Sequence, residues 1–147
     1  MPTQPSPAFW LFKSEPHTWS WQQQWAAGSK GTFWDGVRNF QANNHMKTMR
    51  VGDRGFFYHS GKERAIVGTV AVIKPHYPDG SDASGRFGMV DVAALEAAPR
   101  AVTLAQIKAE PSLSDMVLVK QSRLSVQPVR AAEWRTICAL AGLNPDA

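Results

Sequence analysis

The stretch Ala8-Phe9-Trp10-Leu11-Phe12-Lys13 carries the clearest fold signal in the chain. It is short and rich in aromatic side chains, which favours a β-strand over a helix. Successive residues of a strand point to opposite faces of the sheet, and here both faces are apolar. A strand of this kind is covered on both sides, so we expect it to pair inside a sheet and not at its edge.

Outward from this stretch, short candidate strands and short candidate helices follow one another. Residues 53–60 and 65–74 form a predicted hairpin around the turn 61–64. Further extended segments are expected at residues 33–34, 87–95, 100–102 and 124–126, a loop at 75–85, and helices at 19–27, 38–50, 103–108, 112–116 and 131–141. The strands do not alternate regularly with helices as in βαβ units. The pattern therefore predicts an α+β fold, a small barrel of mostly antiparallel strands.

Length and composition are typical of one folded domain. The chain has 147 residues, of which 44% are hydrophobic and 19% are charged. We expect the domain to cover residues 8–142, between tails at residues 1–7 and 143–147. The single cysteine, Cys138, excludes an internal disulfide and is expected to be a buried thiol. No apolar stretch is long enough to span a membrane, so we expect a cytoplasmic monomer, with the nucleoid or the nucleus left open.

The net charge of +4 is unevenly distributed. Residues 1–74 hold nine Lys and Arg against four Asp and Glu, whereas residues 75–147 hold seven against eight. The excess favours an anionic partner on the side of the N-terminal half, although an ordinary basic surface accounts for it equally well. The four histidines lie far apart in the sequence, and neither nucleotide-binding glycine pattern is present, so no metal and no cofactor is predicted.

The stretch Trp34-Asp35-Gly36-Val37-Arg38-Asn39-Phe40-Gln41 combines an aromatic ring, a turn, an arginine and amide side chains. Glycine suits the positive φ of a tight turn, so Asp35-Gly36 is expected to be one. On a helix over residues 38–50, Arg38 would share a face with Ala42, His45 and Met49, and a cation in the first turn opposes the helix dipole. Such a departure from local rules marks either a functional site or a buried ion pair.

The tryptophans near this stretch allow two interpretations. Trp34 fits either a stacking platform for a flat ligand or a core residue equally well. Trp19, Trp21 and Trp25 share one predicted helix, where Trp21 and Trp25 are four residues apart and can pack as a pair. We expect these three to be core or surface cover and not a cage.

Two further polar segments contain candidate site residues. In Tyr58-His59-Ser60, strand alternation sends His59 and Ser60 to opposite faces, which argues against a catalytic pair. His59 is equally well a hydrogen-bonded structural residue or a ligand contact. In the segment 123–128, Arg123 could meet a phosphate and Ser125 a base or the backbone, although an ordinary edge strand fits the pattern slightly better.

Five ordered blocks of the chain together resemble the EVE domain family, and the resemblance runs from about residue 8 to residue 141. The blocks are Phe9-Trp10-Leu11-Phe12-Lys13-Ser14-Glu15-Pro16, Trp34-Asp35-Gly36-Val37-Arg38-Asn39, Val51-Gly52-Asp53, Tyr58-His59-Ser60 and Gln121-Ser122-Arg123-Leu124-Ser125-Val126-Gln127-Pro128. This family belongs to the PUA-like superfamily and is similar to YTH domains. The resemblance implies a PUA-like pseudobarrel of about five to six strands with short helices around it.

The resemblance also implies a pocket for a modified nucleobase, methylated or hydroxymethylated, in DNA or RNA. The pocket residues that it implies are Lys13, Ser14, Trp34, Val37, Arg38, Asn39, Tyr58, His59, Ser60, Arg123 and Ser125. Trp34 would stack on an extruded base, Ser14, Asn39 and Ser60 would read its edge, and Arg38, Arg123 and Lys13 would meet phosphate. Two positions depart from the usual family pattern: Phe40 replaces a tyrosine, and Asn43 replaces an arginine that would add a positive charge near the pocket.

The expected function is therefore that of a non-catalytic module that binds nucleic acid with modified bases. The alternative is a small-metabolite binder or an enzyme that uses the same cleft, because the fold does not fix the function. The sequence supplies no convincing pair of nucleophile and base for the enzyme. A protein-interaction scaffold is a third option, and it predicts an exposed apolar patch instead of a basic rim.

Overall fold

Six strands form one mixed sheet in the computed structural model, which describes residues 7–147. The tail expected at residues 1–7 lies outside the described residues, apart from Pro7. The strands, in the order in which they neighbour one another, are β2 (Thr32–Trp34), β5 (Gly88–Thr103), β4 (Ala65–Pro78), β3 (Arg54–His59), β1 (Phe9–Ser14) and β6 (Val126–Val129). The helices are α1 (Trp21–Ala26), α2 (Phe40–Thr48), α3 (Leu104–Ala109), α4 (Val117–Lys120) and α5 (Ala131–Ala141), with short 3-10 turns at Gly28–Lys30 and Pro111–Leu113.

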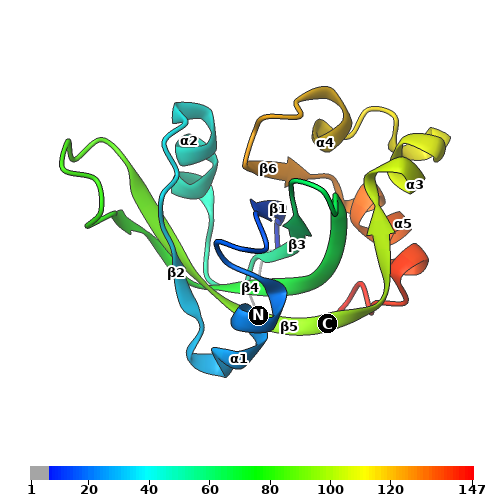
Figure 1. Cartoon of the computed structure of the whole chain (residues 1–147), viewed down its shortest axis with the longest axis horizontal. Helices are drawn as coiled ribbons and strands as arrows, with labels where there is room; N and C mark the ends of the chain where they lie inside the picture. Colours follow the sequence, from blue (N-terminus) through cyan, green and yellow to red (C-terminus); the bar gives the residue numbers. More distant parts are fainter. Residues whose placement is uncertain (1–6) are drawn as a thin grey trace, which may run out of the picture.

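The first strand lies inside the sheet, as its two apolar faces predict. It pairs in parallel with β3, from Phe9 opposite Arg54 to Ser14 opposite His59, and antiparallel with β6 on its other side. The other neighbouring pairs are antiparallel. The sheet curls around its core, as the long curved band of β4 and β5 shows (Figure 1), but β2 and β6 stay its outer strands and do not close it. The expected pseudobarrel is thus confirmed as an open one.

Two hydrophobic clusters cover the two faces of β1. Leu11 belongs to the cluster that α5 completes with Trp134, whereas Trp10 and Phe12 belong to the cluster that contains Trp34. This division follows from strand alternation, because neighbouring side chains of β1 must enter different clusters. It explains why a strand of six residues carries so many large apolar side chains.

Two strands are longer than the sequence predicts. The expected loop at residues 75–85 begins only after Pro78, and the two segments expected at residues 87–95 and 100–102 are one strand, β5. Both differences involve a proline inside a strand. Pro75 and Pro99 lie where the register between β4 and β5 shifts. Regular strand pairing is interrupted at such positions, so a residue without a backbone N–H is tolerated there.

Helix α2 begins at Phe40, so the expectation that Arg38 occupies its first turn is wrong. Asn39 is the N-cap: its backbone is extended, and its side-chain oxygen accepts a hydrogen bond from the Ala42 amide at 2.9 Å. The helix also ends earlier than expected, at Thr48. Buried Asp53 organises the following turn, since it accepts bonds from the Arg50 amide at 3.1 Å and from Trp10 Nε1 at 3.0 Å.

The C-terminal segments cover the other face of the sheet. Helix α5 has the predicted bounds, and Gly142 follows it in the left-handed conformation. Cys138 is buried and unpaired, as predicted. Residues 143–147, expected to be a tail, return to the domain: Leu143 is buried, and Trp134 Nε1 donates to the Pro145 carbonyl at 3.1 Å.

Between β5 and β6, the structure contains the predicted helix that Thr103 caps, but the elements after it differ from those expected. Thr103 caps α3, as expected. The helix expected at residues 112–116 is only the short turn Pro111–Leu113, and the strand expected at residues 124–126 is displaced to Val126–Val129. This strand includes Pro128, which is tolerated because β6 is an outer strand.

Candidate functional site

The main cavity opens between the end of β1 and the segment that contains β2. Its volume is about 450 Å³, within the range of small-ligand sites. Two segments of the chain line it: Lys13, Ser14, Glu15, Thr18 and Trp19 from the first, and Thr32, Phe33, Trp34, Asp35 and Gly36 from the second. One side of the cavity is thus formed by the end of β1 and the residues that follow it, and the other side is formed by β2 and the turn after it.

Trp34 lines the cavity and belongs to the core at the same time. It is only 7% exposed, and its ring meets the rings of Phe12 and Phe57 edge-on at centroid distances of 5.3 and 5.5 Å. Within residues 7–147 its indole N–H has no acceptor, although it is not sealed from solvent. The two interpretations of Trp34 are therefore not exclusive, because the ring is packed against the core and also lines the cavity.

Trp19 is a cavity residue that the sequence analysis missed. It lies before α1, because Ser20 caps that helix and forms a capping box with Gln23. Its backbone carbonyl accepts a bond from Ser14 Oγ at 2.7 Å, and its Nε1 donates to Gln24 Oε1 at 2.9 Å. The sequence Ser20-x-x-Gln23 is itself a capping-box signal, and it would have placed Trp19 outside the helix.

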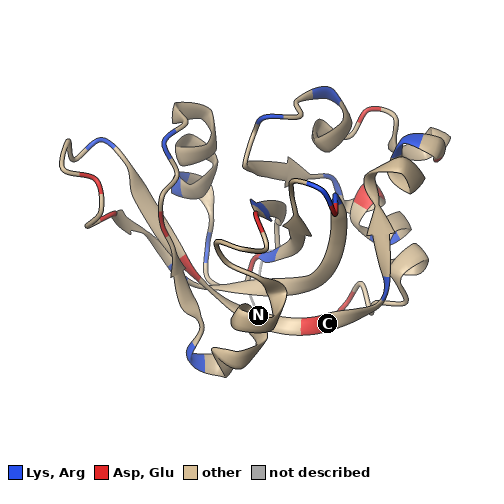
Figure 2. Ribbon diagram, in the orientation of Figure 1, with Lys and Arg blue, Asp and Glu red and all other residues tan. Residues whose placement is uncertain are grey.

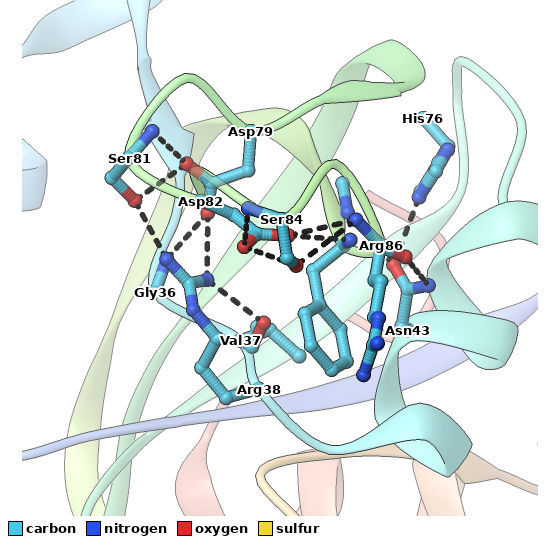
Figure 3. A network of polar contacts seen from close by, with 12 residues as sticks. Gly36, Val37, Arg38, Asn43, His76, Asp79, Ser81, Asp82, Ser84 and Arg86 are labelled. Carbon is cyan, nitrogen blue, oxygen red and sulfur yellow. Dashed lines mark hydrogen bonds and ion pairs between the residues drawn. The ribbon is translucent and has the colours of Figure 1, made fainter.

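The turn at Gly36 is held in place by a carboxylate from another part of the chain. Gly36 has a φ of 78°, as the turn requires, and its amide donates to Asp79 Oδ2 at 2.9 Å. Asp79 is buried and also accepts bonds from the Ser81 amide at 2.8 Å and from Arg38 at 3.1 Å (Figure 3). Burial alone would raise the pKa of Asp79, but hydrogen bonds from Ser81, Gly36 and Arg38 outweigh it and lower the pKa to about 2.

Arg38 points away from the cavity into this network. Its guanidinium pairs with Asp79 and donates to Ser81 Oγ at 3.0 Å, and it lies 5.8 Å from the centre of the Phe87 ring. Of the two explanations that the sequence allowed for Arg38, the structure shows the ion pair with a buried carboxylate. Asn43 is buried too, and its side-chain oxygen lies 2.9 Å from His76 Nε2 (Figure 3). The same oxygen accepts a bond from the Gly88 amide at 3.0 Å. The Asn43 side chain thus faces the β4–β5 connection and is not at the surface, where it could contact a phosphate.

The other residues carried over from the resemblance are divided among several places. Tyr58 and Ser60 line a second cavity of about 290 Å³ that also contains Lys13, and Asn39 and Arg123 line a third of about 320 Å³. Val37 is buried in the core, and Ser125 is half-buried. Of the predicted set, the main cavity thus contains Lys13, Ser14 and Trp34.

His59 has a structural role in the chain. Its Nε2 accepts the Trp21 amide at 3.0 Å at the start of α1, so in this neutral ring Nδ1 carries the proton and donates to Glu63 Oε2 at 2.7 Å. Close packing continues beside it, since a Cβ added to Gly68 would come within 2.4 Å of the Trp21 ring. His59 therefore fixes α1, and through it the segment that ends in Trp19.

Lys13 lies between the main cavity and the second one. Its Nζ donates to the Ser122 carbonyl at 2.7 Å, and burial lowers its pKa from the ordinary value for lysine. The main cavity also contains the exposed carboxylates of Glu15 and Asp35, and Glu15 pairs with His17 at 2.9 Å. The cavity thus combines aromatic surface with hydrogen-bond acceptors and is not itself cationic.

Residues 7–147 contain no group of three or more His, Cys, Asp or Glu side chains placed to hold a metal ion. In the same residues, no helix has the length and apolar character needed to cross a bilayer.

Comparison with known proteins identifies the family. The model of the EVE domain matches residues 8–140. Thymocyte nuclear protein 1 is 34% identical in Gallus gallus and 32% identical in Homo sapiens, over 92% and 93% of this chain and 69% and 75% of the relatives.

Solved structures agree with this result. A Rhodopseudomonas palustris protein is 54% identical with a TM-score of 0.87, covering 92% of this chain and 93% of its own. Human THYN1, solved in complex with DNA containing 5-methylcytosine, is 32% identical with a TM-score of 0.87 over 94% and 99% of the two chains. A YTH domain of Zygosaccharomyces rouxii shares the fold at 19% identity, with a TM-score of 0.57 over 95% and 90%. The chain is a member of the EVE domain family.

Proposed function

We propose that this protein binds nucleic acid and accepts one modified base in the cavity between Trp19 and Trp34. The observation that carries the proposal is the cavity itself, which places two tryptophans and several acceptors around a space of about 450 Å³. Stacking of a base on an aromatic side chain contributes about 1–3 kcal/mol and requires a base that has left its helix.

The polar groups favour a base with an exocyclic amino group. Carboxylates accept hydrogen bonds from the N4 amino group of cytosine, and Glu15 and Asp35 supply carboxylates at the cavity. The free Trp34 N–H can donate to a ring nitrogen or carbonyl of the same base. The 5-methylcytosine in the DNA complex of human THYN1, which is 32% identical to this chain, supports this class of ligand.

The proposal is tested by binding labelled oligonucleotides that differ in a single base. We expect tighter binding when cytosine is replaced by 5-methylcytosine, measured by fluorescence anisotropy at one fixed salt concentration. Trp19→Ala should weaken binding by on the order of tenfold, since it removes one stacking surface. Trp25→Ala is the matched control, because Trp25 is 53% exposed and does not line the cavity.

Two results would contradict the proposal. One is equal affinity for modified and unmodified oligonucleotides across a panel of methylated and hydroxymethylated bases. The other is equal loss of affinity in Trp19→Ala and Trp25→Ala with both variants folded. Circular dichroism melting of each variant separates a binding defect from unfolding.

A further inference from the structure

We infer that a groove beside the main cavity, lined by Lys13, Arg64, Lys108 and Arg123, is the path of the phosphate backbone of a single nucleic-acid strand. This cation groove consists of the second and third cavities, which share Ser122, and it meets the main cavity at Lys13. The inference rests on the proposed function, because it takes the base in the main cavity as the anchor of the strand. Neither Arg64 nor Lys108 belongs to a segment that the family resemblance singled out.

Among the described residues that line the groove, several are cations and none is a carboxylate, although Glu63 lies with Arg64 and Lys108 at an adjoining cavity of about 320 Å³. Lys13, Arg64 and Lys108 line the second cavity together with hydroxyl groups and apolar side chains, and Arg123 lines the third. None of these four cations forms an ion pair within residues 7–147. Figure 2 shows Lys and Arg on the β3–β4 turn, on α3, on α4 and on the connection into β6, around the same side of the domain.

Neighbouring carboxylates are already engaged elsewhere. Glu63, next to Arg64 in the chain, is 2.7 Å from His59 Nδ1, and Asp115 holds Lys120 at 3.0 Å. The four cations therefore keep their charge available to an external anion. Phosphate contacts of this kind supply sequence-independent affinity, whereas the base contact supplies selectivity.

Two of the cations are held in defined places. Lys13 is half-buried and its Nζ is fixed by the Ser122 carbonyl, so a phosphate there would meet a cation that is already partly desolvated. Arg64 has a φ of 46°, a left-handed conformation that is unfavourable for a residue with a Cβ. Its Nε donates to the Gly61 carbonyl at 3.1 Å, which orients the guanidinium at the turn.

The geometry favours a single strand over an intact duplex. The groove starts at a cavity that accepts a base only after the base has left its stack, and backbone phosphates adjacent to that base then lie next to Lys13. Proteins that bind single strands combine in this way a positive groove with aromatic side chains that stack on bases. Single strands of DNA and of RNA both have a phosphate backbone and bases that can stack, so the test includes both.

The test is the salt dependence of binding in the double variant Arg64→Gln/Lys108→Gln. Single-stranded DNA and RNA oligonucleotides, with and without the modified base, are titrated by anisotropy between about 50 and 200 mM salt. We expect affinity to fall on the order of tenfold for modified and unmodified strands alike, and the slope of log K against log salt to decrease in magnitude by about 1.4, or roughly 0.7 per lost phosphate contact. The preference for the modified base should not change.

The double variant Lys74→Gln/Arg86→Gln is the matched control. It removes the same charge from strand β4 and from the β4–β5 connection, outside all three cavities. It should leave the salt slope as in the wild type. Both double variants change exposed side chains, so their melting curves should match that of the wild type.

The possible outcomes separate this inference from the proposed function. An unchanged slope and affinity in Arg64→Gln/Lys108→Gln would overturn the groove, even if the modified base is still preferred. A reduced slope without any preference for a modified base would support the groove and contradict the proposed function. Failure of the wild type to bind any strand at low salt, or equally tight binding of an acidic peptide of the same charge, would also overturn the groove.

Discussion

The wall of the main cavity and the cation groove next to it use their charged residues in opposite ways. Behind the wall, Arg38 is paired with buried Asp79, and the same carboxylate holds the turn at Gly36, which lines the cavity. In the groove, Arg64 and Lys108 have no carboxylate partner among residues 7–147. The Arg38–Asp79 pair therefore contributes to stability and to the shape of the site, whereas Arg64 and Lys108 contribute charge to the groove.

This difference changes which residues a mutational study should compare. A loss of binding after substitution in the wall does not by itself identify a ligand contact, because the wall also stabilises the domain. A loss of binding after substitution of Arg64 or Lys108 is more direct evidence of a ligand contact, since both side chains are exposed and neither forms an ion pair within residues 7–147.

Trp34→Ala should destabilise the protein by roughly 3–5 kcal/mol, because it removes a buried ring that packs against Phe12 and Phe57. The midpoint of thermal unfolding should fall on the order of 10 °C. Phe33→Ala is the control on the same strand: Phe33 is 54% exposed, and its loss should cost about 1 kcal/mol or less. Native-like melting of Trp34→Ala would mean that the ring is only a platform and that the wall is not structural.

Asp79 should make the domain less stable in acid. Its folded pKa of about 2 lies below the unfolded value of 3.8, so its contribution is complete above about pH 4 and is lost as the pH falls through 2. The contribution is on the order of 2 kcal/mol. The difference in unfolding free energy between wild type and Asp79→Asn, measured by urea denaturation, should shrink from pH 5 to pH 2. Parallel curves over this range would show that folding does not lower the pKa of Asp79.

Arg64→Asn should change the free energy of unfolding by no more than about 0.5 kcal/mol. Asparagine tolerates the left-handed conformation of this residue, and the lost side-chain bond to Gly61 is exposed. Urea denaturation measures this effect, and anisotropy of a single-stranded oligonucleotide should show weaker binding in the same variant. A destabilisation comparable with that of Asp79→Asn would remove the distinction between groove and wall.

Much of the fold could be predicted from local patterns. The two apolar faces of β1, the hairpin of β3 and β4, the Thr103 cap and the bounds of α5 all follow from short-range sequence signals, and the structure confirms them. The errors occurred where distant pairing decides the outcome. The continuity of β5 through Pro99 depends on a register shift against β4, which no local pattern contains.

The candidate site could be predicted only in part. Lys13, Ser14 and Trp34 lie at the ends of strands, where the sequence already indicated a change from apolar to polar residues, and the structure brings them to one cavity. Trp19 was missed because the helix was expected to begin at residue 19, whereas Ser20 is its N-cap and α1 begins at Trp21. Arg38 was placed in a helix because the expected helix began two residues too early, and whether it marks a functional site or an ion pair depends on the distant Asp79.

The sequence by itself determined the class of fold, the two-faced first strand and the membership of the EVE family, because periodicity and ordered motifs are local properties of the chain. Tertiary structure alone decided which charged side chains are paired within the protein and which are accessible to a ligand. Asp79 is 41 residues from Arg38, and Lys13 is 109 residues from Ser122. Whether a charged side chain is paired depends on which groups the fold brings within a few ångströms of it, because the Coulomb energy depends on that distance. The sequence of either segment alone does not contain this distance.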